Sequence, residues 1–159
     1  MTIQIGDRIP EVVLQILRDG VEQIDTRQLF DHSRRVLFAV PGAFTPTCSE
    51  RHLPGYVEHF DAFRQRGIEV ACLSVNDPFV MQAWGQSQNV PRELLMLADG
   101  NAEFVRALGL HMDASSYGMG TRARRFALYA DQGVIKELQV EAPGEFRVSS
   151  AEHMLGLIG

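Results

Sequence analysis

The run Arg35-Val36-Leu37-Phe38-Ala39-Val40 is continuously apolar after Arg35 and shows no alternation of polar and apolar side chains. Strands covered on both faces of a parallel sheet have this pattern, whereas half-exposed strands alternate. The run stops at Pro41-Gly42, a pair that ends regular structure. The sequence therefore predicts a strand over residues 35–40 that is covered on both faces of a parallel sheet.

A long amphipathic helix is expected directly after this strand, over residues 47–66. Its apolar residues recur at steps of three and four, as a helix packed on a sheet requires. They are Leu53, Tyr56, Val57, Phe60 and Phe63. Gly67 closes the helix, and Pro54 is expected to kink it.

Strands and helices then alternate along the chain. The patterns predict strands over residues 68–75 and 94–98, and helices over 79–87 and 102–108. Residues 110–121 are irregular and contain Gly118 and Gly120, so a loop is expected there. A hairpin over 124–140, turning at Asp131-Gln132-Gly133, precedes a last helix capped by Ser149 or Ser150.

An N-terminal hairpin is predicted from the apolar, β-branched runs 12–17 and 21–24, which Asp19-Gly20 separates. Buried strands alternating with helices indicate an α/β fold, with a central mixed sheet and helices on both faces. A chain of 159 residues, 45% of them apolar, is long enough for one core. We therefore expect a single domain over residues 1–159.

Composition excludes several classes of partner. The formal charge of −5 provides no attraction for nucleic acid or for an anionic membrane surface. No apolar stretch approaches the ~20 residues of a membrane span, and the first residues lack the pattern of a secretory signal. Cys48 and Cys72 have neither disulfide-framework nor metal-finger spacing. A cytoplasmic protein with reduced thiols is expected.

The segment Pro41-Gly42-Ala43-Phe44-Thr45-Pro46-Thr47-Cys48 joins the buried strand to the helix. It lies at the carboxyl end of the strand, where open α/β sheets bind ligands. Cys48 falls in the first helical turn, where unpaired N–H groups and the helix dipole favour a thiolate, the nucleophilic form of sulfur. We expect this sulfur to be accessible to small oxidants at the mouth of a dry pocket.

Attack of a thiolate on an O–O bond also needs donors that hold the peroxide and positive charge for the departing oxygen. Thr45 and the Cys48 amide are the expected donors. Pro41 is expected to form an apolar wall that excludes water from the sulfur.

The segment PGAFTPTCSERHLPGY resembles the active-site stretch of type II peroxiredoxins. The resemblance continues through residues 71–77, through Arg124-Arg125-Phe126 and to Gly144-Glu145-Phe146. It implies a thioredoxin-like fold and a thiol peroxidase in which Cys48 attacks hydroperoxides. It also implies peroxide contact by Thr45, shielding by Pro41 and participation of an arginine that matches Arg125.

Simpler interpretations of several residues stay open. Cys72 lies in an apolar strand, and inert core packing is favoured over a redox role. His52, four residues after Cys48, suggests a Cys-His pair or, with His59, a metal site, but a surface or structural histidine is favoured. If residues 124–130 form a strand, Arg124 and Arg125 point to opposite faces, and one meets solvent.

No cofactor or metal is expected; the oxidised sulfur must instead be reduced by another thiol. Ser149 occupies the region where many members of the group carry a resolving cysteine. The sequence thus predicts a one-cysteine mechanism with an external reductant, glutathione with glutaredoxin or else thioredoxin. The resemblance also implies a homodimer. Alternatives on the same fold are a thiol-disulfide exchange protein and a non-catalytic redox sensor.

Overall fold

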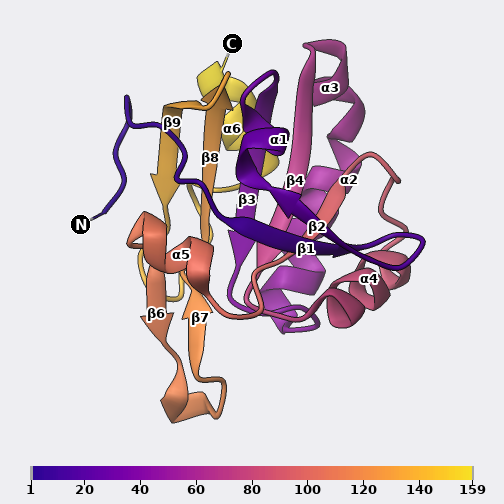
Figure 1. The fold of residues 1–159 in the computed structure, drawn as a ribbon, viewed down its shortest axis with the longest axis vertical. Coiled ribbons are helices and arrows are strands. Elements are labelled where there is room, and N and C mark those ends of the chain that lie inside the picture. The colour runs from indigo at the N-terminus through magenta and orange to yellow at the C-terminus, as the bar shows by residue number, and fades with distance from the viewer. Residues whose placement is uncertain (1, 159) are drawn as a thin grey trace.

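A seven-stranded mixed β-sheet forms the centre of the computed structural model, which describes residues 2–158 (Figure 1). The strand order is β2-β1-β5-β4-β3-β8-β9. These strands are β1 (Val13–Leu17), β2 (Val21–Asp25), β3 (Arg34–Val40), β4 (Ile68–Ser74), β5 (Leu95–Ala98), β8 (Phe126–Asp131) and β9 (Val134–Val140). The strand predicted to be buried on both faces, β3, pairs in parallel with β4 and antiparallel with β8.

Helices cover both faces of the sheet, as the sequence predicts. They are α1 (Thr26–Phe30), α2 (Leu53–Glu58), α3 (Phe60–Gln65), α4 (Pro78–Ser87), α5 (Glu103–Leu108) and α6 (Ala151–Ile158). Val36, Phe38 and Val40 of β3 pack in the core cluster that includes side chains of α2, α3, α4 and α6. Leu37 and Ala39 pack in the cluster that includes α1 and α5. The continuous apolar run of β3 thus serves two cores, one on each face.

The helix predicted over residues 47–66 is divided into shorter segments. Residues Cys48–His52 form a wide π-helical turn in which the Leu53 N–H donates to the Cys48 carbonyl, and α2 follows. Pro54 stands in the first turn of α2, where its missing N–H is tolerated. The clear break comes at His59, whose φ of −97° and ψ of 10° separate α2 from α3. The kink expected at Pro54 is therefore displaced.

The prediction of an irregular loop over residues 110–121 is wrong. Two three-residue strands, β6 (His111–Asp113) and β7 (Thr121–Ala123), pair with each other in a separate sheet that extends from the main body (Figure 1). A single 3₁₀ turn, Ser115–Tyr117, lies between them. Strands this short show no readable alternation, so their pairing becomes visible only in three dimensions.

The hairpins predicted at both ends of the chain are confirmed, with one change. Strand β8 begins at Phe126, so Arg124 and Arg125 lie in the connection between β7 and β8 rather than on a strand. The expectation that a strand includes both arginines is therefore wrong. Of the two expected caps for α6, Ser150 accepts a hydrogen bond at its Oγ from the His153 N–H.

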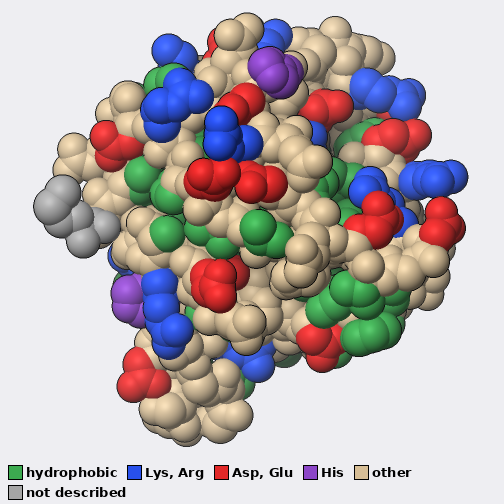
Figure 2. Space-filling model, viewed as in Figure 1, with side chains coloured by type: hydrophobic (Ala, Val, Ile, Leu, Met, Phe, Trp, Pro, Cys, Tyr) green, Lys and Arg blue, Asp and Glu red, His purple; other side chains and the backbone are tan. Residues whose placement is uncertain are grey.

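Acidic and basic side chains are interspersed on the face drawn in Figure 2, without a large patch of one sign. This distribution agrees with the modest net charge of −5. Among residues 2–158, none of the helices has the length and apolar character needed to cross a bilayer.

Candidate active site

Cys48 lies where the chain leaves the carboxyl end of β3 and enters a helix. The Ser49 N–H donates to the Thr45 carbonyl at 2.9 Å, so the helix begins at Thr45 and places Cys48 in the first turn, as predicted. The accessibility expected from the sequence is wrong, because the Cys48 residue is 0% exposed. Its side chain packs in the cluster that contains Leu53 and Tyr56, since this helical turn lies directly on the sheet.

The connecting loop is held from both sides. The Ala43 N–H donates to Asn76 Oδ1 at 3.0 Å, and the Thr45 hydroxyl donates to the Gly42 carbonyl at 2.6 Å. Phe44 has a φ of 65°, a left-handed conformation that costs energy for any residue with a Cβ. These contacts offset that strain and fix the approach of the chain to Cys48.

Arg125 provides the guanidinium of this site. Its Nη2 donates to Cys48 Sγ at 3.1 Å, and its Nη1 donates to His52 Nδ1 at 2.9 Å. A charged donor interacts more strongly with an anionic sulfur than with a neutral thiol. The structure therefore joins the cysteine singled out by the strand–helix junction to the arginine indicated by the resemblance.

His52 is a buried structural residue of this site. Its Nδ1 accepts from Arg125, so its proton is on Nε2, which donates to the Ser149 carbonyl at 3.0 Å. Burial and, to a smaller extent, the Arg125 guanidinium lower the pKa of His52 to about 3. The ring is neutral near pH 7 and orients Arg125, which contradicts both the Cys-His pair and the surface alternative.

The pKa of His52 leads to a prediction about acid stability. Its folded pKa of about 3 lies below the ordinary 6.5, so the unfolded chain binds a proton that the folded chain excludes. This contribution to stability is complete above about pH 6.5 and is lost as pH falls toward 3, by ~2 kcal/mol at about pH 5. The free energy of unfolding, measured with urea across this pH range, is expected to fall less steeply with decreasing pH for His52→Asn than for the unmodified chain.

The exposed His32 supplies the control for that measurement. We expect His32→Asn to reproduce the slope of the unmodified protein. Equal slopes in all three proteins would contradict a buried neutral His52.

Pro41 and Arg125 line one cavity of ≈ 220 Å³, together with Thr47, Met112, Arg124 and residues 141–145. Pro41 therefore lies beside the arginine, and its role in excluding water from the sulfur stays a prediction. Neither Cys48 nor Thr45 belongs to this lining, and the Thr45 hydroxyl is directed to the Gly42 carbonyl. The structure brings Arg125 directly to Cys48, while the sulfur itself does not line the cavity.

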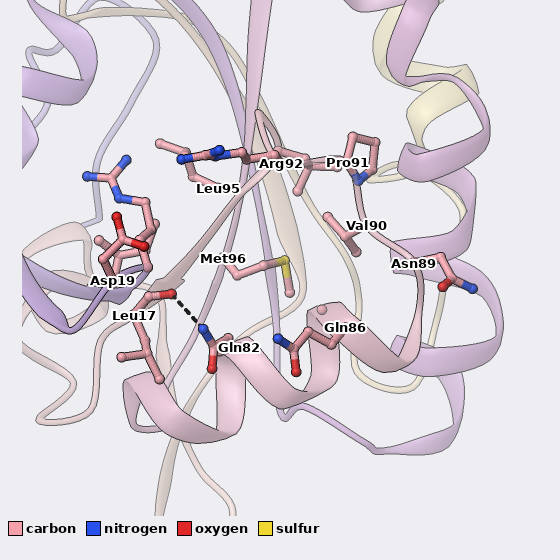
Figure 3. Close-up of a pocket in the computed structure, with 14 residues that line it drawn as sticks. Leu17, Asp19, Gln82, Gln86, Asn89, Val90, Pro91, Arg92, Leu95 and Met96 are labelled. Carbon is pink, nitrogen blue, oxygen red and sulfur yellow. Dashed lines mark hydrogen bonds between the residues drawn. The ribbon is translucent and has the colours of Figure 1, made fainter.

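A second cavity, of ≈ 520 Å³, lies beside α4, where β1 and β5 diverge after a single paired position, Gln15 with Ala98 (Figure 3). Gln82 Nε2 donates to the Leu17 carbonyl at its edge, and Met96 points into it. No cysteine or histidine lines it. It therefore holds no nucleophile comparable to Cys48.

Cys72 on β4 is 0% exposed and packs in the same apolar cluster as Cys48. Burial, with the neighbouring Cys48 as a smaller cause, raises the pKa of the Cys72 thiol well above its ordinary value. Both cysteines are free thiols. These observations agree with the predicted core role of Cys72.

Several residues of the site were not identified from the sequence. Glu141, Tyr56 and Phe146 surround the His52–Arg125 pair. The sequence indicates no role for Glu141 and only an apolar role for Tyr56. It places Phe146 only in the resembling stretch, and it assigns Ser149 the roles of a possible helix cap and of a missing resolving cysteine. A hydrophobic pattern carries no signal for such polar contacts between distant segments. Among residues 2–158, no group of three or more His, Cys, Asp or Glu side chains is arranged to hold a metal ion.

Comparison with known proteins places this chain in a family. Residues 4–155 match the Redoxin family. The chain is 47% identical to Peroxiredoxin-2E-2, chloroplastic, of Oryza sativa, covering 97% of this chain and 72% of that one. It is 40% identical to Peroxiredoxin-2B of Arabidopsis thaliana, covering 96% of each.

A solved structure of similar shape is reduced Prx3 of Vibrio vulnificus in complex with H₂O₂. It superposes with a TM-score of 0.95 at 47% identity and covers 99% of this chain and 100% of that one. The mixed sheet and the strand–helix junction at Cys48 indicate the same family as these relatives. The chain belongs to the Redoxin family and is a type II peroxiredoxin, a thiol-dependent peroxidase with a thioredoxin-like fold.

Proposed function

We propose that Cys48 is the attacking thiol for hydrogen peroxide and organic hydroperoxides. The observation that carries this proposal is the 3.1 Å contact between Arg125 Nη2 and Cys48 Sγ at the start of a helix. The sulfur attacks one peroxide oxygen, an S–O bond forms and the O–O bond breaks. The departing oxygen takes a proton and leaves as water or alcohol, and Cys48 becomes a sulfenic acid.

Arg125 stabilises negative charge at two stages of this step. Before reaction its guanidinium interacts with the thiolate, and during O–O cleavage the same donors face the charge that develops on the departing oxygen. Because neutral His52 binds Nη1, the guanidinium is held in place before the peroxide enters. The Vibrio vulnificus relative was solved with H₂O₂, which supports the same substrate here.

Thr45 acts as an acceptor in this scheme, in contrast to the donor role expected from the sequence. Its hydroxyl proton is directed to the Gly42 carbonyl, so its oxygen lone pairs are available to the O–H of a hydroperoxide. Such a contact orients the peroxide so that the O–O bond points away from the sulfur.

Substitution of Thr45 by valine tests this role. We expect Thr45→Val to fold and to lose about 10²-fold in kcat/KM for peroxide, the effect typical of one missing polar contact in a transition state. Thr45→Ser keeps the hydroxyl and is expected to stay within several-fold of the unmodified enzyme. Steady-state peroxide consumption measures both variants, and near-normal kinetics of Thr45→Val would contradict the role.

We propose that an external thiol reduces the sulfenic acid. Ser149 stands where a resolving cysteine is found in many members of the group, and Cys72 is buried in the sheet. Because Cys48 is also fully buried, the first helical turn must shift before a protein thiol reaches the oxidised sulfur. Glutathione with glutaredoxin is the first proposed donor and thioredoxin the second.

A peroxide-consumption assay with each donor system in turn tests the one-cysteine scheme. We expect turnover with at least one system, and Cys72→Ser is expected to retain it. Loss of turnover in Cys72→Ser would instead make Cys72 part of the cycle. Reduction of insulin disulfides without peroxide consumption would favour thiol-disulfide exchange, and an oxidation-dependent complex without turnover would favour a redox sensor.

A homodimer is proposed as well, through the loops beside the site. Phe44, Phe79 and Tyr117 are 56%, 62% and 82% exposed. Phe44 directly follows Ala43, whose N–H donates to Asn76, and Phe79 lies three residues after Asn76 in the chain. The segment of Tyr117 also approaches this loop, because a Cβ added to Gly42 would lie 3.2 Å from the side chain of Met119, two residues after Tyr117. Exposed aromatic side chains are typical of an interface. Sedimentation of the protein with Phe79→Ser tests this, with weakened self-association expected.

A further inference from the structure

We propose that Glu141 is a positioning residue for the peroxide reaction, because it closes a ring of hydrogen bonds that begins and ends at Arg125. The ring runs from the Arg125 backbone through Glu141, Ser149 and His52 to the Arg125 guanidinium. This inference rests on the proposed function of Cys48 and Arg125, and it adds a residue that never contacts the sulfur.

The Glu141 carboxylate is surrounded by donors of a single segment. Oε2 accepts from the Val148 and Ser149 N–H groups, each at 2.8 Å, and from the Ser149 hydroxyl at 2.7 Å. The Arg147 N–H lies 2.9 Å from both carboxylate oxygens. Glu141 is 4% exposed. A buried carboxylate with this many donors fixes the backbone of residues 147–149.

Ser149 transmits this constraint through its carbonyl. That oxygen accepts from His52 Nε2 at 3.0 Å and from the Tyr56 hydroxyl at 2.8 Å. Because the other ring nitrogen of His52 binds Arg125, the position of the Ser149 carbonyl determines the rotation of the imidazole. A displaced Ser149 would therefore release His52 and, with it, Nη1 of Arg125.

The backbone of Glu141 completes the ring. Its N–H donates to the Arg125 carbonyl at 2.9 Å, directly after the β8–β9 pairing ends. One residue therefore fixes the backbone of Arg125 and, through Ser149 and His52, its guanidinium. Arginine is otherwise a long, flexible side chain, so such support aligns its donors before the peroxide binds.

A purely structural role for Glu141 makes a different prediction from a positioning role. If the carboxylate only anchors the 147–149 segment, its loss lowers stability and leaves the chemistry of Cys48 unchanged. If it positions Arg125, its loss slows the reaction with peroxide and leaves the reductant step unchanged. The two half-reactions are separated by varying peroxide and reductant independently.

Glu141→Gln is the test variant, because it keeps the size of the side chain and replaces one acceptor oxygen by an NH₂ group. Asp99→Asn is the matched control. Asp99 is 3% exposed and also accepts two backbone N–H groups, those of Phe104 and Val105, but it makes no hydrogen bond to a residue of the ring. Thermal unfolding measures the stability lost in each variant.

We expect Glu141→Gln to lower kcat/KM for peroxide at least tenfold without changing KM for the reductant. Asp99→Asn is expected to keep kcat/KM for peroxide within about twofold of the unmodified enzyme, at a comparable loss of stability. In a double-mutant cycle, Glu141→Gln and His52→Asn are expected to be non-additive, because both act through Arg125. A normal peroxide step in folded Glu141→Gln, or full additivity, would overturn the proposal.

Should Glu141→Gln fail to fold, Ser149→Ala decides the question. It removes one donor to Oε2 and leaves the Ser149 carbonyl, so a smaller loss confined to the peroxide step is expected. An unchanged peroxide step in that variant would overturn the proposal. Turnover by Cys48→Ser would instead show that the proposed function fails, which distinguishes the two outcomes.

Discussion

Replacement of Cys48 by serine is expected to abolish peroxide turnover completely. Serine keeps the shape of the side chain, but its hydroxyl stays protonated near pH 7 and supplies no anionic nucleophile for the O–O bond. Arg125 then donates to a neutral oxygen, and no sulfenic acid forms. Peroxide consumption with each reductant system measures the loss, and the mass of the peroxide-treated protein shows whether an oxygen atom has been added.

Circular dichroism of Cys48→Ser is expected to show a folded protein, because Cys48 contributes only one small side chain to a large apolar cluster. Cys72→Ser provides the matched control, with the same substitution at the other buried thiol. Equal losses from the two substitutions would refute the one-cysteine scheme. Residual turnover in Cys48→Ser would place the nucleophile elsewhere.

Replacement of Arg125 by methionine is expected to lower kcat/KM for peroxide by roughly 10³-fold, at the upper end of the effect of one transition-state donor. Both of its functions are lost at once, because methionine donates neither to Cys48 nor to His52. Stopped-flow measurement of Cys48 oxidation under single-turnover conditions isolates this step from reduction.

Two further variants show what the arginine contributes. Arg125→Lys keeps the positive charge but replaces the planar two-nitrogen donor by a single ammonium group, so an intermediate loss is expected. Arg51→Met removes a nearby cation that stacks on Phe146, 4.8 Å from the ring centroid, and makes no hydrogen bond to Cys48. Arg51→Met is expected to keep kcat/KM for peroxide within about threefold of the unmodified enzyme. Equal losses in Arg51→Met and Arg125→Met would indicate a general charge effect and contradict the assigned geometry.

The sheet and its covering helices were predictable because their patterns repeat over short distances. Val36 to Val40 showed that β3 is buried on both faces, and the two core clusters confirm it. The elements that were missed or misplaced carry weak local patterns. Strands β6 and β7 have three residues each, and α1 has five, opened by a capping box at Asp25. The division of the long helix at His59 also has no signature in its apolar spacing.

The site was predictable only in part. The strand–helix junction nominated Cys48, Thr45 and Pro41 from local chemistry, whereas Arg125 depended on the resemblance. The accessibility of the sulfur was predicted wrongly, because burial depends on which side chains the fold packs above a residue. The pairing of Thr45 with the Gly42 carbonyl likewise reverses its expected donor role.

The sequence by itself determined the order of the elements, the two-faced core of β3 and the place of Cys48 in a first helical turn. Only the tertiary structure decided which polar groups meet that sulfur. Arg125 is 77 residues from Cys48 in the chain, and Ser149 is 97 residues from His52. Helix and strand periodicities report neighbours a few residues apart, so contacts across such separations arise from the strand order of the sheet and from the packing of α6 and the 141–149 segment.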